Sequence, residues 1–195
     1  MDQQQKEFDC TTLVIGMTGS VGVVTMHEYV YKFRRFFAKE VHLMMSRSAQ
    51  RFILPYALQL FSDHPVLTDL FTLMDDIQVP HIELARKADL LLIMPATANI
   101  LGKAAGGICD DLITTTIVAC QAPVVFVPSM NEVMWTDQVV QRNVAILKEV
   151  GYYVLDPSDQ GVEVSDLSVG GGAMPPFESV LLSLKLILAT NRSEE

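Results

Sequence analysis

Several features are scarce in this sequence of 195 residues, and each scarcity excludes a class of protein. The three cysteines (Cys10, Cys109 and Cys120) are an odd number without paired spacing, so neither a disulfide framework nor a zinc site is indicated. Lysine and arginine number 14 against 23 acidic residues, and this net charge of −9 argues against a nucleic-acid surface. The longest apolar run, around residues 90–94, is far shorter than the roughly 20 residues of a membrane span, so no membrane partner is expected.

The remaining composition fits a cytoplasmic globular protein. Half of the residues are hydrophobic, and we interpret that high share as a sign of buried subunit interfaces. Residues 1–9 are polar and do not resemble a signal peptide. No segment has the character of a linker between domains, so residues 1–195 are expected to form a single domain.

Short apolar runs alternate with helical patterns along the chain. The runs at residues 12–16, 41–45, 90–94 and 124–127, with a weaker one at 152–155, are continuous, which is typical of strands buried on both faces of a parallel sheet. Apolar residues three and four apart predict helices within residues 23–37, 100–108, 139–147 and 177–188. The alternation predicts an α/β fold, a doubly wound parallel sheet in a three-layer sandwich of the Rossmann or flavodoxin type.

Ligands bind beyond the carboxyl ends of the strands in such sheets, so the loops there are candidate binding sites. The segment Gly-Met-Thr-Gly-Ser at residues 16–20 is neither a complete G-x-G-x-x-G nor a Walker motif. Its glycines allow a close approach to an anion, or it forms a plain turn capped by Ser20. Ser46, Ser48 and Phe52 could contact a phosphate, a ribityl chain and a ring, or form a capped helix with a core aromatic.

The segment Pro-Ala-Thr-Ala-Asn at residues 95–99 also has two interpretations. Thr97 or Asn99 caps a helix, or the small residues form a platform for a flat cofactor with Asn99 donating amide hydrogen bonds. Asn131 in the segment 128–135 caps a helix that extends through Val150, or that helix N-terminus receives a carboxylate. The downstream Gly-rich segment at residues 160–176 is expected to be a flexible flap.

Among the histidines, His81 is the best candidate for a general base because its ordinary pKa lies near neutrality, although a surface or capping role is the plainer interpretation. His27, His42 and His64 have no comparable neighbourhood in the sequence. The adjacent acidic residues at 110–111 would point in different directions on a helix. We therefore expect no metal site.

Taken together, residues 16–20, His81, residues 95–99 and the Pro-x-Met-Asn-x-x-Met-Trp octet at 128–135 resemble the homo-oligomeric flavin-containing cysteine decarboxylases. The match runs from about residue 13 to residue 157 in the right order and spacing. Flavin prenyltransferases share the fold but lack the Met-Asn-x-x-Met-Trp block. Two branches remain, the phosphopantothenoylcysteine decarboxylases of coenzyme A biosynthesis and the lantibiotic peptidyl-cysteine decarboxylases of the epidermin and mersacidin type.

The flap separates these two branches. Phosphopantothenoylcysteine decarboxylases carry a flap cysteine beside an Arg-Met-containing run, and this cysteine returns reducing equivalents to the intermediate. Residues 162–176 here contain neither cysteine nor arginine, and residues 99–102 and 139–157 also look closer to the mersacidin-type enzyme. The resemblance therefore implies oxidative decarboxylation of the C-terminal cysteine of a ribosomally made, lantibiotic-like precursor peptide to an aminoenethiol.

Three alternatives stay open beside that interpretation. The chain could be a phosphopantothenoylcysteine decarboxylase, a non-catalytic flavin-binding regulatory relative of the halotolerance type, or a subunit that partners another enzyme, as in dipicolinate synthesis. Oxidation is needed for the decarboxylation of a C-terminal cysteine. Without it, a cysteine carboxylate that loses carbon dioxide leaves a carbanion that has no electron sink. Hydride transfer from Cβ to the flavin creates a thioaldehyde, and the acid can then decarboxylate as a β-keto acid does.

The resemblance also implies roles for individual residues. His81 would be the base or proton partner, Asn131 would bind the substrate carboxylate or its amide, and Met134 would shape the pocket. The cofactor-binding set comprises Gly19, Ser20, Ser46, Phe52, Pro95, Thr97 and Asn99, and the substrate clamp comprises Gly170, Gly171, Gly172, Met174 and Pro175. FMN is the expected cofactor, with FAD as the alternative because mersacidin-type enzymes are associated with it. The family further implies a homotrimer with flavin between protomers, in some members packed into a dodecamer.

Overall fold

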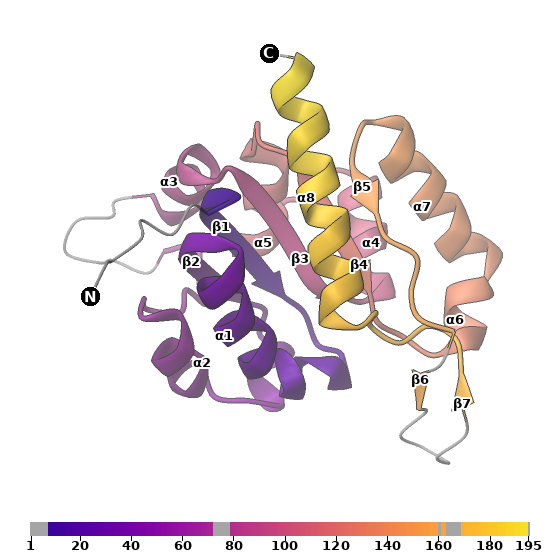
Figure 1. Ribbon diagram of the computed structural model, residues 1–195. Coiled ribbons are helices and arrows are strands. Elements are labelled where there is room, and N and C mark those ends of the chain that lie inside the picture. Colours follow the sequence, from indigo (N-terminus) through magenta and orange to yellow (C-terminus); the bar gives the residue numbers. More distant parts are fainter. Residues whose placement is uncertain (1–7, 72–78, 160, 163–168, 195) are drawn as a thin grey trace.

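The computed structural model describes residues 8–71, 79–159, 161–162 and 169–194 (Figure 1). A five-stranded parallel sheet with the strand order β2-β1-β3-β4-β5 forms its centre. The strands are β1 (Cys10–Met17), β2 (Ala38–Met45), β3 (Leu90–Ala96), β4 (Val124–Pro128) and β5 (Tyr153–Val154). This is the flavodoxin-like order, so the predicted doubly wound parallel sheet is confirmed.

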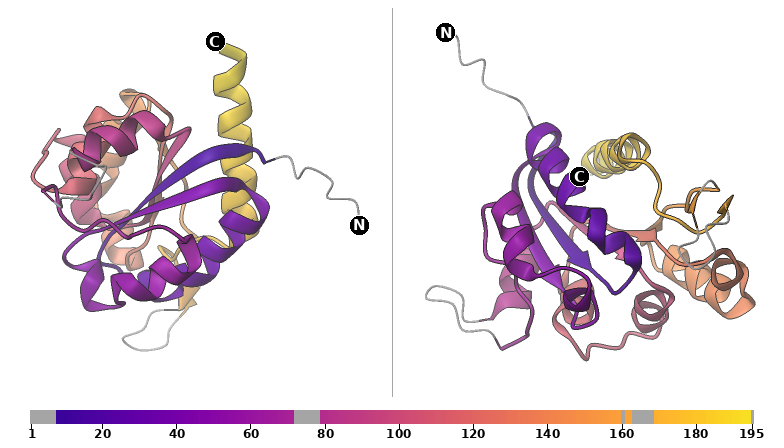
Figure 2. Two further views of the ribbon diagram at one scale, coloured as in Figure 1. Left: turned by 90° about the vertical axis from the view of Figure 1, so that its left-hand side faces the viewer. Right: turned by 90° about the horizontal axis from the view of Figure 1, so that it is seen from below.

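Successive side chains of the strands enter two different cores. In β3, Leu90, Leu92 and Met94 lie in one hydrophobic cluster, whereas Leu91 and Ile93 lie in the other. Both faces of the sheet are covered by helices, as Figure 2 shows, which explains why the strands are continuously apolar. The first face carries α1 (Met26–Phe36), α2 (Pro55–Ser62) and α8 (Phe177–Glu194); the second carries α3 (Pro80–Lys87), α4 (Ala98–Ala105), α5 (Leu112–Ala119) and α7 (Gln138–Glu149).

Two predicted helices begin or end differently from the expectation. The chain enters α1 through a short 3₁₀ helix, η1 (Val21–Thr25), and the helix predicted to reach residue 108 ends at Ala105. Among the described residues, no helix has the length and apolar character that crossing a bilayer requires.

The single helix predicted from Asn131 to Val150 is wrong, because the chain forms α6 (Glu132–Thr136) and then α7. Asp137 separates them, since its extended backbone ends the first helix and its carboxylate accepts a hydrogen bond from Val139 N at 2.8 Å to begin the second. The helix that Asn131 caps is therefore only five residues long.

The strand order places a topological switch point between β1 and β3, where adjacent connections leave in opposite directions. Thr18 follows β1, and its hydroxyl donates to Pro95 O at 2.7 Å while accepting from Thr97 N at 3.0 Å. These bonds fix the two loops that border the switch point. A ligand site is expected at this edge of the sheet.

Candidate cofactor and substrate site

A cavity of about 930 Å³ opens at the carboxyl edge of the sheet. The loops after β1, β2 and β3 provide most of its wall. Four of the predicted cofactor residues line it, namely Gly19, Ser46, Thr97 and Asn99, and so does Met134 from α6. The volume lies within the range of about 300–1,000 Å³ that is usual for small-molecule sites.

Close contact between two loops gives this cavity its shape. A Cβ placed on Gly19 would lie 2.5 Å from Ser48 Cβ, so only glycine allows the loop after β1 to approach the loop after β2 this closely. The second loop is fixed in turn, because Ser46 Oγ accepts from Ala49 N at 3.2 Å and Ser46 N donates to Met17 O at 2.9 Å. The sequence therefore builds one continuous wall from two strand ends.

Three cationic side chains that belong to none of the predicted site residues also line the cavity. Arg47 and Arg51 come from the loop after β2 and its short 3₁₀ helix η2 (Ala49–Arg51), and Lys103 comes from α4. Arg47 stands two residues after the buried strand β2, a position that could have singled it out, whereas Arg51 has no such signal. With the neighbouring hydroxyl and amide groups, these cations form a donor set that suits the phosphate and ribityl groups of a flavin.

Lys103 is held at the cavity by two carboxylates. Its Nζ lies 2.8 Å from both oxygens of Asp110 and 3.6 Å from Asp111 Oδ2. The hydrogen bond to Asp110 raises the pKa of Lys103, and the same bond lowers the pKa of Asp110. Asp111 also caps α5 by accepting from Thr114 N at 2.8 Å, so the pair is fixed relative to the helix.

A second cavity of about 500 Å³ is lined by η1, the segment after β4 and residues 173–174, and it adjoins the first at Gly19 and Ser20. Ser20, Asn131 and Met174 line it, and Ser20 Oγ lies 2.8 Å from Ser129 Oγ. Asn131 Oδ1 accepts from Met134 N at 2.9 Å, which orients the side chain and leaves its amide nitrogen to donate elsewhere. The predicted cofactor residue Ser20 is thus placed on the second cavity rather than the first.

Of the predicted clamp residues, Met174 lines this second cavity, and its neighbours contact the segment beside it. The strands β6 (Gly161–Val162) and β7 (Val169–Gly170) pair antiparallel, and residues 163–168 lie outside the described part of the chain. Gly172 has φ +94°, and a Cβ there would lie 2.3 Å from Met130 O, so glycine is required for the contact in which Met130 N donates to Gly172 O at 2.9 Å.

Contacts on either side of Gly172 hold the rest of the clamp in place. Gly171 N donates to Glu132 Oε2 at 3.3 Å, and Gly170 lies against the same carboxylate. Pro175 O accepts from Tyr29 Oη at 2.9 Å. The structure therefore brings Gly170, Gly171 and Gly172 to the segment that contains Asn131, Met174 to η1 and Pro175 to α1.

Three of the predicted catalytic and cofactor-binding residues line neither cavity. Pro95 is buried in β3, where its carbonyl accepts from Thr18, and Phe52 follows η2 with 49% of its surface exposed. His81 lies in α3, which packs against α5, and it lines neither cavity. Its Nδ1 is buried and has no hydrogen-bond partner among the described residues.

Sequence comparison relates the chain to decarboxylases of two kinds. The sequence matches the family described as Flavoprotein over residues 1–187. Mersacidin decarboxylase of a Bacillus species is 33% identical over 180 residues, which cover 92% of this chain and 89% of that protein. The coenzyme A biosynthesis bifunctional protein CoaBC of Bacillus subtilis is 43% identical over 119 residues, which cover 61% of this chain but only 29% of that longer protein.

The solved structures that resemble this chain include decarboxylases of the same two kinds. The FMN-dependent cysteine decarboxylase SpaF superposes with a TM-score of 0.77 at 30% identity, covering 92% of this chain and 97% of that one. EpiD complexed with the substrate peptide DSYTC has a TM-score of 0.78 at 30% identity, with coverages of 88% and 97%. A PPC decarboxylase complexed with pantothenoylaminoethenethiol has a TM-score of 0.77 at 29% identity, with coverages of 90% and 97%.

Proposed function

The chain belongs to the Flavoprotein family, among its flavin-dependent cysteine decarboxylases, and on that premise we propose that it oxidatively decarboxylates the C-terminal cysteine of a precursor peptide. The product would be an aminoenethiol, and the reaction would take place in the cytoplasm. FMN is the proposed cofactor. The residues present fit it, because cations, hydroxyls and amides surround a cavity of suitable size.

The observation that carries the peptide assignment is the composition of the clamp. Residues 162–176 contain no cysteine, so the clamp offers no thiol to return electrons to an oxidised intermediate. A reaction that ends at the oxidised product fits such a clamp. The relatives named for mersacidin and for a complex with a substrate peptide support the same choice.

The second cavity suits the carboxyl end of a peptide. Asn131 would donate its amide N–H to the carboxylate or to the last peptide group, and Gly170–Pro175 would lie along the preceding residues. Met134, which lines the larger cavity three residues further on, would limit the space between cofactor and cysteine. A bound flavin would accept the hydride from Cβ, and the protein would supply position and a proton acceptor.

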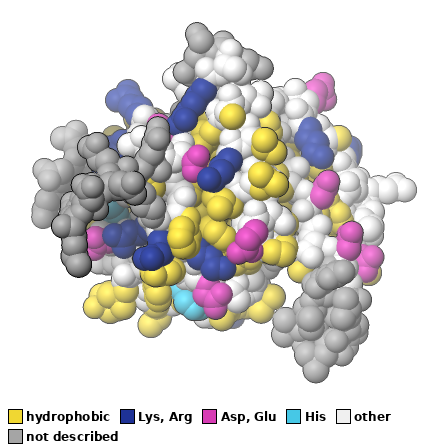
Figure 3. Space-filling view, viewed as in Figure 1, with side chains coloured by type: hydrophobic (Ala, Val, Ile, Leu, Met, Phe, Trp, Pro, Cys, Tyr) yellow, Lys and Arg dark blue, Asp and Glu magenta, His cyan; other side chains and the backbone are white. Residues whose placement is uncertain are grey.

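His81 would reach the reacting thiol from a neighbouring copy of the chain. It lines neither cavity of its own chain. A homotrimer with the flavin between protomers would bring His81 of one protomer to the cavities of its neighbour. Exposed large apolar side chains on α2 and α8, such as Tyr56, Leu60 and Leu182, support such association. Figure 3 shows hydrophobic side chains gathered among charged ones on the face over α1 and α8.

The deciding experiment offers the purified yellow protein a peptide ending in cysteine and, separately, phosphopantothenoylcysteine. Mass spectrometry of the peptide should show a loss of about 46 Da, the mass of carbon dioxide plus two hydrogens. Matched peptides that end in serine or in cysteine amide should stay unchanged, because they lack the thiol or the free carboxylate. Heat release of the flavin followed by mass spectrometry distinguishes FMN from FAD.

The coenzyme A branch is the second candidate, supported by the 43% identity to CoaBC over 119 residues. It predicts turnover of phosphopantothenoylcysteine with loss of carbon dioxide alone, about 44 Da, and no reaction of the peptide. If neither substrate changes while flavin stays bound, a regulatory or partner-subunit role replaces both enzyme assignments.

A further inference from the structure

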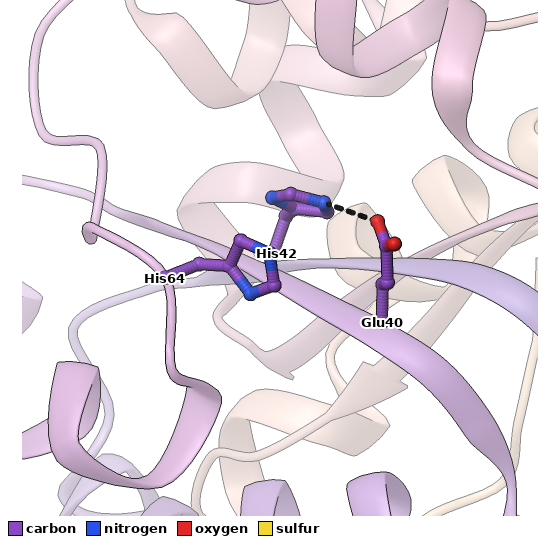
Figure 4. Close-up of side chains that lie close together, drawn as sticks. All are labelled: Glu40, His42 and His64. Atoms are coloured by element: carbon purple, nitrogen blue, oxygen red, sulfur yellow. Dashed lines mark ion pairs between the residues drawn. The ribbon is translucent and has the colours of Figure 1, made fainter.

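Two histidines and a glutamate that neither cavity uses lie together at the edge of the sheet. β2 is the edge strand, and Glu40 and His42 stand two residues apart on it, so that their side chains share one face. His64 comes from the segment after α2. Figure 4 shows its ring beside that of His42, while His42 points its other side toward Glu40.

The distances within this cluster match those of a metal site. His42 Nε2 lies 3.5 Å from Glu40 Oε2, and the ring centroids of His42 and His64 are 4.2 Å apart. One ligand atom from each of the three residues lies within 4.8 Å of the others. Metal–ligand bonds of about 2.1 Å at tetrahedral angles separate two ligand atoms by about 3.4 Å, so binding would need only a small contraction.

The two histidines of the cluster differ in their hydrogen bonds. His42 Nε2 is buried and has no hydrogen-bond partner among the described residues, and its distance to Glu40 exceeds that of a good hydrogen bond. His64 Nδ1 lies 3.1 Å from Ser62 O. Donation from Nδ1 to that carbonyl fixes the tautomer in which Nε2 carries the lone pair, which is the usual support of a metal-bound histidine.

The charges around the cluster favour a neutral imidazole. Burial lowers the pKa of His42, His64 lowers it further, and Lys87 also opposes protonation, whereas Glu40 favours it. Lys87 is itself paired with Glu83 at 2.6 Å. The groups that face His42 are therefore one carboxylate, one imidazole and one ammonium group that is already paired with Glu83.

We propose that Glu40, His42 and His64 bind one divalent transition-metal cation of the zinc type, with water at the fourth position. The segment after α2 already pairs with β2, because Leu67 N donates to Leu43 O and Met45 N donates to Leu67 O, both at 2.9 Å. The cation would fasten that segment to the sheet edge at a second place. This site is separate from the flavin chemistry, so either proposal can fail without the other.

Isothermal titration of ZnCl₂ into the flavin-loaded full chain, freed of any purification tag, tests the site. One zinc ion should bind per chain and raise the melting temperature. Replacement of zinc by Co²⁺ should produce the intense visible absorption of a tetrahedral site. Glu40→Gln, His42→Gln and His64→Gln should each weaken binding by at least about tenfold, since loss of even a supporting residue costs about 10–100-fold.

His27→Gln is the matched control, because His27 is also half-buried and bonded to a backbone carbonyl but lies outside the cluster. It should bind zinc as the original chain does. Absence of zinc binding, or binding that all three cluster variants retain, overturns the proposal. Flavin content and circular dichroism verify folding. If His42→Gln does not fold, the more exposed Glu40 and the surface segment of His64 still decide the outcome.

Discussion

The loops after β1, β2 and β3 meet in one cavity, whereas His81, on α3, lies outside it. The difference follows from the way a parallel sheet is built. Strand order alone brings the carboxyl ends of neighbouring strands together, so residues such as Gly19 and Thr97 must meet within one chain. A helix on the outer layer has no such constraint, and its residues can complete a site that belongs to another copy. Under the proposal, the cavity needs one chain and the action of His81 needs a second copy, and five experiments test this comparison.

The largest effect is expected from His81→Asn. If His81 acts on the proton rather than on folding, turnover of the cysteine peptide should fall by about 10²- to 10⁴-fold, the usual contribution of a general base. The flavin absorbance should stay intact because His81 lines neither cavity. Absorbance spectra and single-turnover mass spectrometry provide the two readouts, with His27→Asn as control. A colourless variant would contradict the assignment.

Co-expression sharpens that result. Chains that carry His81→Asn, mixed in one oligomer with chains that carry Gly19→Ala, should recover activity above the sum of the separate variants if two copies share each site. Activity equal to that sum would mean that His81 works within its own chain.

The next largest effect is expected on flavin affinity, from a substitution in the wall of the larger cavity. Gly19→Ala places a Cβ 2.5 Å from Ser48 Cβ, and overpacking of this kind costs about 1–3 kcal/mol. Flavin affinity should therefore fall about tenfold or more, as measured by fluorescence titration of the apoprotein. Gly102→Ala is the control, since a Cβ there meets only Asn143 Nδ2 at 3.4 Å. Unchanged affinity in Gly19→Ala would show that the close contact of the two loops is not needed.

Asn131→Ala tests the second cavity. Loss of a hydrogen bond to the substrate should raise the Michaelis constant by about tenfold, because a missing partner costs about 1–3 kcal/mol. Asp137→Ala removes a comparable helix cap, about 1 kcal/mol, but does not touch either cavity. If the Michaelis constant changes equally in both variants, Asn131 acts only as a helix cap.

The smallest effect is expected at Lys103. Its hydrogen bond to Asp110 raises its pKa above the ordinary 10.5, so the charge persists as the pH rises through that value and is lost only above it. Flavin affinity should therefore stay level between about pH 7 and pH 9. Lys103→Met should weaken binding by less than about fivefold because the pair is partly exposed, and Lys148→Met should have no effect. A decline centred within that pH interval would mean that another group titrates.

The sequence predicted the sheet well, because strands buried on both faces leave continuous apolar runs. It did not predict α5, whose residues Leu-Ile-Thr-Thr-Thr-Ile-Val-Ala are rich in β-branched side chains and become helical through the capping box of Asp111 and Thr114. Among the residues that line the cavities, Gly19, Thr97 and Asn131 lie within glycine, small-residue or asparagine motifs, and the sequence singles them out. Arg47 and Arg51 carry no motif and gain meaning only once β2 lies beside β1. His42 and His64 are likewise distant along the chain and meet only in three dimensions.

The backbone contact at Gly172 has a mechanical consequence. Its left-handed conformation joins the hairpin to Met130, and Met130 is adjacent to Asn131. A side chain at position 172 would break this backbone contact and thereby shift Asn131, the residue proposed to hold the carboxylate, without altering Asn131 itself.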